Sequence, residues 1–291
     1  MRVPLKRPPP PPEPKRIRQI IVVSDLHCGC RLGLCPPGGV QLDNGGPYFP
    51  SDLQRRMWEC WEEFWTEWVP RNTQDEPFAV VLNGDVVEGR HHRTTTQISQ
   101  NLADQAKVAR ECIRYALDTT NDAPLYWVRG TDAHVGPSGE DEERLASELG
   151  AVPNAVGQYA RHELRLRVGE ILVDIQHHIA PVNSNAYETT ALQKEFVIAC
   201  EEAGRWNQEA PDVIVRSHRH RLAKTEVPTA KGSGVVISTP GWQLKTPFVY
   251  RLAGARQSLS QVGGILVRHG ESHIYTKHKV WSIPRAPVEE L

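Results

Sequence analysis

The chain has 291 residues, of which 39% are hydrophobic, and its formal net charge is -1. This length and composition allow a large buried core, which excludes disorder of the whole chain. The 34 Lys and Arg are balanced by 35 Asp and Glu, so the composition does not indicate a basic protein that coats duplex DNA. No apolar run approaches the roughly 18 residues that span a bilayer, and we expect a cytoplasmic protein without a membrane partner.

Residues 1–17 differ in composition from the rest of the chain. Five consecutive prolines occupy positions 8–12, and the basic residues around them outnumber the single acid, Glu13. Proline-rich segments favour an extended, solvated polyproline conformation. We therefore expect a disordered, basic, proline-rich tail over residues 1–17 and a single domain over residues 18–291.

The six cysteines are expected to be reduced, because the chain shows no export signal. Cys28, Cys30 and Cys35 lie close together in sequence. A structural zinc site is an alternative interpretation of these three thiols, although no fourth ligand is evident nearby.

The first half of the chain alternates between predicted strands and helices. The stretch 18–28 predicts an apolar strand, and the expected elements that follow are a helix at 51–69, a strand at 78–83, a helix at 96–119, a strand at 125–129 and a helix at 140–149. We expect the first helix to begin at Ser51 or Asp52 and to be stopped by Pro70. This order is typical of a parallel sheet covered by helices.

Four tryptophans share one face of the first predicted helix. They are Trp58, Trp61, Trp65 and Trp68, at spacings of three, four and three residues. Such a stripe could stack on nucleobases or form a dimer interface. We interpret it as the face that packs on the sheet, since aromatic side chains commonly fill cores.

The second half of the chain is richer in predicted strands. The expected elements are a hairpin at 161–168 and 170–176, a helix at 186–203, a strand at 213–216 and antiparallel strands at 222–227, 234–239, 262–268 and 272–280. The predicted fold class is α/β. Two sheets that face one another, with helices outside, form the simplest architecture that uses all these strands.

Metal-ligating residue types recur where the predicted strands end. Asp25 and His27 follow the first strand with one residue between them, and both can turn toward one ion because the backbone leaves its pleat there. Asp85 follows a glycine on a tight turn, and its two oxygens can bridge two cations. His218 and His220 form a second spaced pair after an apolar strand. Together these residues predict a metal site built from strand ends.

On these residues the chain resembles the calcineurin-like metallophosphoesterase family. The family pattern is Asp-x-His, Gly-Asp-x-x-Asp/Glu, Gly-Asn-His-Asp/Glu, a His, and Gly-His-x-His. The matching segments are Asp25-Leu26-His27, Gly84-Asp85-Val86-Val87-Glu88, Gly130-Thr131-Asp132-Ala133-His134, His177-His178 and Ser217-His218-Arg219-His220. The resemblance implies a four-layer sandwich of two mixed β-sheets flanked by helices.

The resemblance also assigns ligands to two divalent metal ions. Asp25, His27 and His220 would hold the first ion, Asp85 would bridge, and His177 with His218 would hold the second. His178 competes with His177, because strand alternation points the two adjacent imidazoles in opposite directions and does not say which faces the ions. Manganese is the expected metal, with iron, zinc or nickel as alternatives.

The third motif departs most clearly from the family pattern. Thr131 stands where the family has an Asn ligand, and the histidine comes three positions later, at His134. Phage and prophage members of the family have a similar Gly-Thr-x-x-His arrangement. His134 is the expected general acid, and Asp132 or the Thr131 hydroxyl would complete the shell of the second metal. Ser217 replaces a family Gly, which we expect to be harmless because serine is small.

The implied activity is hydrolysis of phosphomonoesters or phosphodiesters by a hydroxide that bridges the two metals. The substrate would be a nucleotide or nucleic acid, as in the distantly similar Mre11/SbcD nuclease branch, or a small phosphoester. His91 and His92 follow the Asp85 turn closely enough to contact a bound phosphate together with Arg90 or Arg93, and the alternative is that they are solvated loop residues. The alternatives are a catalytically inactive metal-binding scaffold of the same fold and a metal-dependent hydrolase of non-phosphate bonds.

Overall fold

The computed structural model describes residues 16–91, 94–121, 123–136, 138–179, 185–251, 258–271, 273–283 and 288–290. Within these ranges the protein is a mixed α/β structure with several sheets and helices, which confirms the predicted class. Most of the predicted proline-rich tail, together with His92 and Arg93, lies outside the described residues. No helix in the described ranges is both long and apolar enough to cross a membrane.

The larger sheet has six strands and carries the first predicted strand at its centre. Its order is β13 (Ile274–Ser282), β12 (Gln261–His269), β1 (Gln19–Val23), β4 (Ala79–Asn83), β5 (Leu125–Val128) and β6 (Ala160–Arg161). β1, β4 and β5 are parallel, whereas β12 and β13 add antiparallel partners. All five residues of β1 are buried, which explains why the four after Gln19 form a continuous apolar run rather than an alternating one.

The smaller sheet has five strands from the second half of the chain. Its order is β10 (Ala223–Thr229), β11 (Gly232–Ser238), β9 (Val213–Arg216), β8 (Ile171–Ile175) and β7 (Leu164–Val168). The four late strands expected to form one antiparallel set are therefore divided, with β10 and β11 here and β12 and β13 in the larger sheet. The prediction of one set was wrong, because β11 pairs in parallel with β9.

Side chains from both sheets meet in one apolar cluster. Ile20, Val22 and Val81 of the larger sheet contribute to it together with Val173 and Val215 of the smaller one. The opposite face of the larger sheet packs against helices, and the opposite face of the smaller sheet packs against a single long helix. The core is thus built on both faces of both sheets.

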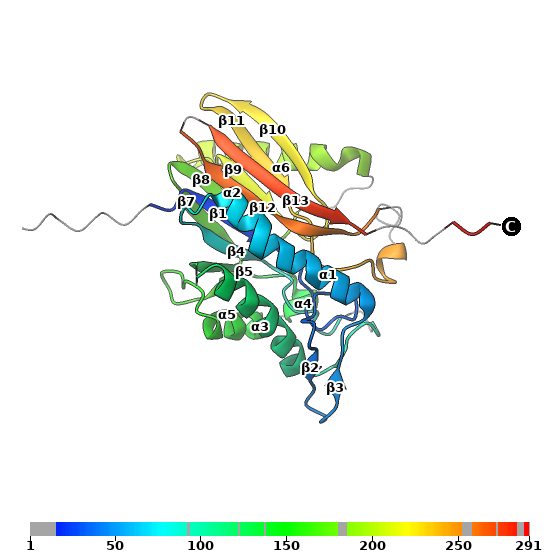
Figure 1. The fold of residues 1–291 in the computed structure, drawn as a ribbon. Coiled ribbons are helices and arrows are strands. Elements are labelled where there is room, and N and C mark those ends of the chain that lie inside the picture. The colour runs from blue at the N-terminus through cyan, green and yellow to red at the C-terminus, as the bar shows by residue number, and fades with distance from the viewer. Residues whose placement is uncertain are drawn as a thin grey trace, which may run out of the picture.

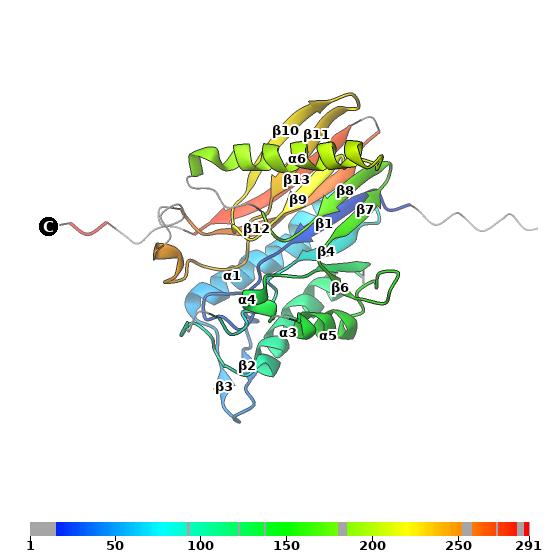
Figure 2. The same cartoon turned by 180° about the vertical axis from the view of Figure 1, so that it is seen from behind.

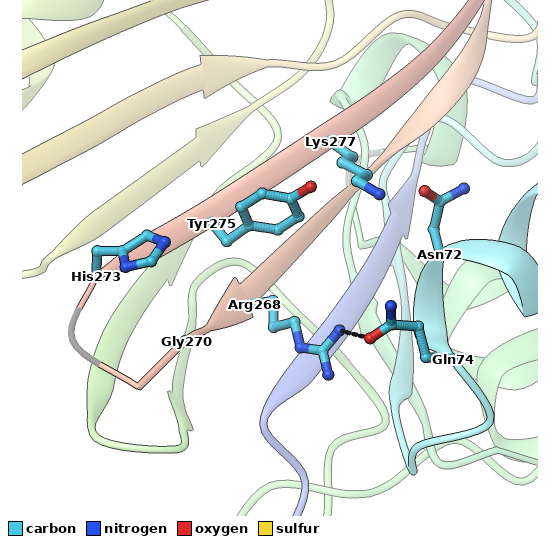
Figure 3. Close-up of a pocket in the computed structure, with 7 residues that line it drawn as sticks. All are labelled: Asn72, Gln74, Arg268, Gly270, His273, Tyr275 and Lys277. Atoms are coloured by element: carbon cyan, nitrogen blue, oxygen red, sulfur yellow. Dashed lines mark hydrogen bonds between the residues drawn. The ribbon is translucent and has the colours of Figure 1, made fainter.

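Helices cover the outer faces of the two sheets (Figures 1 and 2). On the larger sheet these are α1 (Asp52–Glu63), α2 (Val69–Thr73), α3 (Leu102–Thr119) and α5 (Glu140–Glu148), and on the smaller sheet α6 (Glu188–Arg205). The short helix α4 (Asp132–Val135) follows β5. The hairpin β2 (Val40–Gln41) and β3 (Pro47–Tyr48) projects at the bottom of Figure 1, and 3-10 turns occupy Asn185–Tyr187 and Val249–Arg251.

The first helix does not end at Pro70, so that prediction was wrong. Ser51 caps α1 as expected, and the chain then passes through a π-helix, Phe64–Trp68, into α2. Val69 donates its backbone N–H to Phe64 O, five residues back, so the wider turn shifts the bonding pattern just before the proline. Because Pro70 then occupies the first turn of α2, its missing N–H is tolerated.

Three of the four tryptophans in the stripe lie in the core, as predicted, and the half-buried Trp68 packs against it. Trp61 and Trp65 are fully buried, and Trp58 is nearly so. Trp61 meets Trp242 edge to face with 4.7 Å between ring centroids, which ties this helix to the segment that follows β11. The helix predicted at 96–119 begins only at Leu102, where the Asn101 side chain caps it.

Candidate metal centre

The carboxyl ends of β1 and β4 are joined by backbone hydrogen bonds. Asp25 donates its N–H to Gly84 O at 2.9 Å, and His27 donates to Asp85 O at 3.0 Å. Because β1 and β4 are parallel, their following loops leave the same edge of the sheet and can pair in this way. The pairing places the first two motifs side by side.

The smaller sheet contributes its own parallel strand ends. His177 follows β8 and His218 follows β9, and Ser217 donates its N–H to His177 O at 2.9 Å. Asn83, the last residue of β4, donates from Nδ2 to Ser217 Oγ at 2.6 Å. The Ser217 hydroxyl also lies 2.7 Å from Thr239 Oγ1. Serine at this position therefore links the two sheets, which the sequence had indicated only as a small replacement.

The backbone is left-handed at the five residues that carry the motif side chains after β1, β4 and β9. They are Asp25 (φ 54°), His27 (φ 45°), Asp85 (φ 49°), His218 (φ 69°) and His220 (φ 50°). Residues other than glycine rarely adopt this conformation, and each instance costs on the order of 1–3 kcal/mol. Five of them around one point indicate that the fold holds these side chains in place against local preference, as is common at functional sites.

Asp25, His27 and His220 form one ligand group. One ligand atom from each lies within 4.8 Å of the other two. His220 Nε2 is 3.1 Å from Asp25 Oδ1 and also 3.1 Å from His27 Nε2. Two imidazole nitrogens that face each other at this distance can share at most one proton, so at least one lone pair is directed at the group.

Asp85, His177 and His218 form a second group by the same criterion. Asp85 Oδ2 is 3.0 Å from His177 Nε2 and 3.8 Å from His218 Nδ1. His177 is buried and its Nδ1 donates to Asn83 O at 2.6 Å, which aims Nε2 at the carboxylates, whereas His178 is exposed. Of the two adjacent imidazoles, the structure therefore brings His177 into the group.

Three buried atoms test whether these residues fit cations. Asp25 Oδ1 and Asp85 Oδ2 lie 3.8 and 3.0 Å from His177 Nε2, yet none of these three atoms has a hydrogen bond of acceptable geometry. A buried polar atom without a partner costs about 1–3 kcal/mol, and such atoms are rare unless they serve an ion or water. Mixed carboxylate and imidazole ligation suits first-row divalent metals. The described residues thus fit a metal centre.

The charges in the cluster stabilise one another. Burial alone would raise the pKa of Asp25, but attraction to His220 and His177 outweighs it and lowers this pKa to about 2. The pKa of Asp85 is lowered well below its ordinary value, because His177 and His134 overcome the effect of burial. Burial would lower the pKa of His177, yet Asp85 and Asp25 raise it to about 10. Without a cation, the imidazolium of His177 balances the carboxylates.

The third motif contributes Thr131 and His134 to the same place. Thr131 donates to Asp85 Oδ1 from its backbone N–H at 2.7 Å and from its hydroxyl at 3.2 Å, which fixes the carboxylate. His134 donates from Nδ1 to Glu88 O at 2.6 Å, and its Nε2 is 3.8 Å from Asp85 Oδ2. Burial, with His27 nearby, lowers the pKa of His134 to about 4 despite Asp85. His134 also groups with His27 and Asp85.

Asp132 differs from Thr131 and His134 in its position relative to the ligand groups. It is exposed at the first turn of α4 and belongs to none of the ligand groups among the described residues. His91, in contrast, groups with Glu88 and His134, and its ring centroid is 4.3 Å from that of His134. The predicted roles of His92 and Arg93 concern residues outside the described ranges.

Glu88 is a site residue that the sequence analysis quoted in a motif without giving it a role. Its side chain is buried, with Oε2 3.0 Å from His27 Nδ1 and Oε1 3.1 Å from His91 Nε2. Thr96 and Gln243 donate to the same carboxylate. Burial opposes ionisation, but the bonds from His27 and His91 outweigh it and lower the pKa of Glu88. Its place at the end of the second motif was the available signal.

Glu142 is a second residue that the sequence analysis missed. Its Oε1 accepts the N–H of Val86, and its Oε2 accepts the N–H groups of Gly130 and of the Trp127 ring. Burial raises the pKa of Glu142 to about 7. The carboxyl joins the turns that carry the second and third motifs. No sequence signal identifies it, because it is one of four consecutive acidic residues.

The cysteines do not form a metal group among the described residues. All six are free, and the ligand groups contain only Asp, Glu and His. Burial raises the pKa of both Cys30 and Cys35 to about 12, so these thiols stay protonated at neutral pH. The zinc interpretation therefore gains no support.

No protein-family model and no curated protein matches the chain. Among solved structures, the chain is similar to Vacuolar Protein Sorting 29 from Cryptosporidium parvum at 11% identity and a TM-score of 0.33, with 92% of this chain and 100% of that chain covered. The sulfate thiohydrolase SoxB from Thermus thermophilus, in complex with glycerol, is 12% identical with a TM-score of 0.38, and the match covers 94% of this chain and 57% of that chain. The Thermotoga maritima protein TM1076 is 10% identical with a TM-score of 0.35, and the match covers 91% of this chain and 100% of that chain. Similarity this low carries no argument about activity, so the function must be inferred from the site.

Proposed function

We propose that this protein is a dinuclear-metal-dependent phosphoesterase with the four-layer metallophosphoesterase fold. One observation carries the proposal: two carboxylates and four imidazoles from four strand ends converge, while three buried polar atoms among them find no hydrogen-bond partner of acceptable geometry. Two cations would satisfy these atoms and offset the strained backbone. The phage-type branch and a cytoplasmic location stay predictions from the sequence.

The two ligand groups divide the proposed metals between them. Asp25, His27 and His220 would hold one cation, and His177 with His218 would hold the other. Asp85 lies in two of the ligand groups, which supports a bridging role. Manganese is the proposed metal, with iron, zinc or nickel as alternatives. Bound divalent cations lower the pKa of water toward neutrality and neutralise charge on a phosphoryl group.

His134 is the proposed proton-transfer residue beside the metals. Its Nδ1 is fixed on Glu88 O, because a carbonyl only accepts, so Nε2 is the atom that exchanges a proton. The lowered pKa leaves Nε2 unprotonated at neutral pH in the metal-free protein. His134 must therefore take up a proton before it can donate one to a leaving alkoxide. Asp132 stays a prediction as a residue that, in place of the Thr131 hydroxyl, would complete the shell of the second metal.

Metal analysis beside a panel of phosphoesters tests the proposal. The panel contains an aryl phosphomonoester, a bis-aryl phosphodiester, a cyclic nucleotide, and single- and double-stranded DNA, each with added Mn²⁺. We expect bound metal and hydrolysis of at least one ester. Asp85→Asn should abolish hydrolysis, and Asp118→Asn, which makes the same change on the exposed surface of α3, should not.

The outcomes separate the competing functions. Hydrolysis that survives Asp85→Asn would refute the proposed centre. Bound metal without hydrolysis of any ester would favour a metal-binding scaffold or a hydrolase of other bonds. A protein without metal, and without stabilisation by Mn²⁺ or Zn²⁺, would refute the metal centre itself.

A further inference from the structure

A shallow pocket lies at the opposite end of β1 from the metal centre. Its pocket of about 220 Å³ is lined by Asn72, Gln74, Arg268, Gly270, His273, Tyr275 and Lys277. Arg268 pairs in register with Gln19, the first residue of β1, whereas Asp25 lies just beyond the last. At about 3.3 Å per residue, the pocket and the metal centre are separated by roughly 20 Å.

The pocket is formed by an edge hairpin and a helix end. His273, Tyr275 and Lys277 extend from or next to β13, the edge strand of the larger sheet, while Arg268 comes from β12 (Figure 3). Asn72 and Gln74 close the opposite side at the end of α2. Tyr275 and Lys277 are two apart on the strand and so share one face, with Lys277 Nζ 5.4 Å from the centroid of the tyrosine ring.

The lining of the pocket is cationic and rich in donors. It contains a guanidinium, an ammonium, an imidazole, a phenol and two amides, and no carboxylate. Arg268 is held in one orientation, because it donates to Gln74 Oε1 at 3.1 Å and to Glu76 Oε2 at 2.7 Å. A guanidinium has five N–H donors, and these two bonds use two of them. Arg18, which donates to Gly270 O, adds positive charge beside the pocket.

Lys277 lacks the compensation that Arg268 has. Within the described part of the chain it forms no ion pair, whereas the next lysine on this face, Lys279, pairs with Glu63 at 2.7 Å. The pocket is thus a half-enclosed place where positive charge exceeds negative charge, in a protein whose net charge is only -1. Such a place attracts an anion.

We propose that this pocket binds a phosphate group. Its volume is below the roughly 300–1,000 Å³ of sites that enclose whole small molecules, so it suits a single anionic group better than a complete ligand. Arginine and lysine together offer the bidentate and point-charge contacts by which proteins hold phosphate. The phosphate can be free or carried by a nucleotide, whose base could lie on the exposed Tyr275 ring. This site does not depend on the proposed hydrolysis.

Calorimetric titration of the full chain with inorganic phosphate and with AMP tests the proposal. Lys277→Glu should weaken the binding of both probes at least tenfold, and Lys277→Gln should weaken it less. The matched control is Lys194→Glu, which reverses one exposed charge on α6 and should bind as the unchanged protein does. All three variants keep the metal centre, so phosphate bound there cancels in the comparison.

Each result has a defined meaning. Equal loss of phosphate and AMP binding in Lys277→Glu supports a site for the phosphate alone. If AMP binds more tightly than phosphate, and Tyr275→Ala removes this difference, the site also holds the base. Binding that is the same in Lys277→Glu and Lys194→Glu, or no saturable binding of either probe at millimolar concentration, would overturn the proposal. If the protein hydrolyses none of the esters in the panel, the phosphate-binding result is unaffected.

Discussion

Replacing Glu88 with glutamine tests how the site controls one of its own ligands. The carboxylate accepts from His27 Nδ1, which places the imidazole hydrogen on Nδ1 and the lone pair on Nε2, the atom directed at the ligand group. Glutamine has nearly the same shape, but its amide nitrogen donates. If that nitrogen faces His27, the imidazole shifts its proton to Nε2 and can no longer bind a cation.

The magnitude follows from the bonds that are lost. Four donors converge on Glu88, from His27, His91, Thr96 and Gln243, and one amide oxygen can satisfy only part of them. A hydrogen bond to a charged group contributes about 1.5–3 kcal/mol. Loss of one such partner of a ligating histidine typically weakens metal binding about 10- to 100-fold, which corresponds to about 1.4–2.8 kcal/mol.

The assay is competition for Mn²⁺ against a chelator of known affinity, supported by the metal content of the purified variant. Thr96→Val is the matched control, because it removes one donor to Glu88 without touching His27, and it should change the affinity for Mn²⁺ no more than about threefold. Affinity of Glu88→Gln within twofold of the unchanged protein would show that Glu88 does not orient His27.

Three further predictions concern the same centre. Gly130→Ala would place a Cβ 2.2 Å from Asp85 Oδ1, so it should lower both the melting temperature and the metal content. The control Gly204→Ala lies in open space on α6 and should leave the metal content unchanged while raising the melting temperature slightly. Equal melting temperatures for the two variants would contradict this prediction. Because the pKa of His177 is raised to about 10, cation binding at neutral pH must release the proton of this imidazole. Metal affinity should therefore rise by up to about tenfold per pH unit, as measured by calorimetry in buffers of different ionisation enthalpy. An affinity that does not change with pH would argue against His177 as a ligand. His134→Gln should reduce hydrolysis by about 10² to 10⁴ with metal content preserved if the residue transfers protons, and parallel loss of metal would instead make it a ligand.

Much of the metal centre could be predicted from the sequence because its residues come directly after strands. Asp25, Asp85 and His218 each follow an apolar segment whose strand character is evident from composition, and parallel strands bring their carboxyl ends to one edge. The residue types and their positions after strands therefore predicted both where the site lies and that it binds metal. Continuation of the helix past Pro70 could not be predicted in this way, because it rests on the five-residue hydrogen bond from Val69 N–H to Phe64 O, which leaves no signal in the sequence.

The local pattern by itself determined the ligand types, most strand positions and the presence of a core-facing tryptophan stripe. Only the tertiary structure decided that His177 rather than His178 turns inward, since that choice depends on Asn83 O of β4, a strand of the other sheet. It also decided the roles of Glu88 and Glu142, whose partners lie on other segments. Hydrogen bonds between segments far apart in sequence leave no periodic pattern along the chain, and these bonds hold the predicted ligands in their strained conformations.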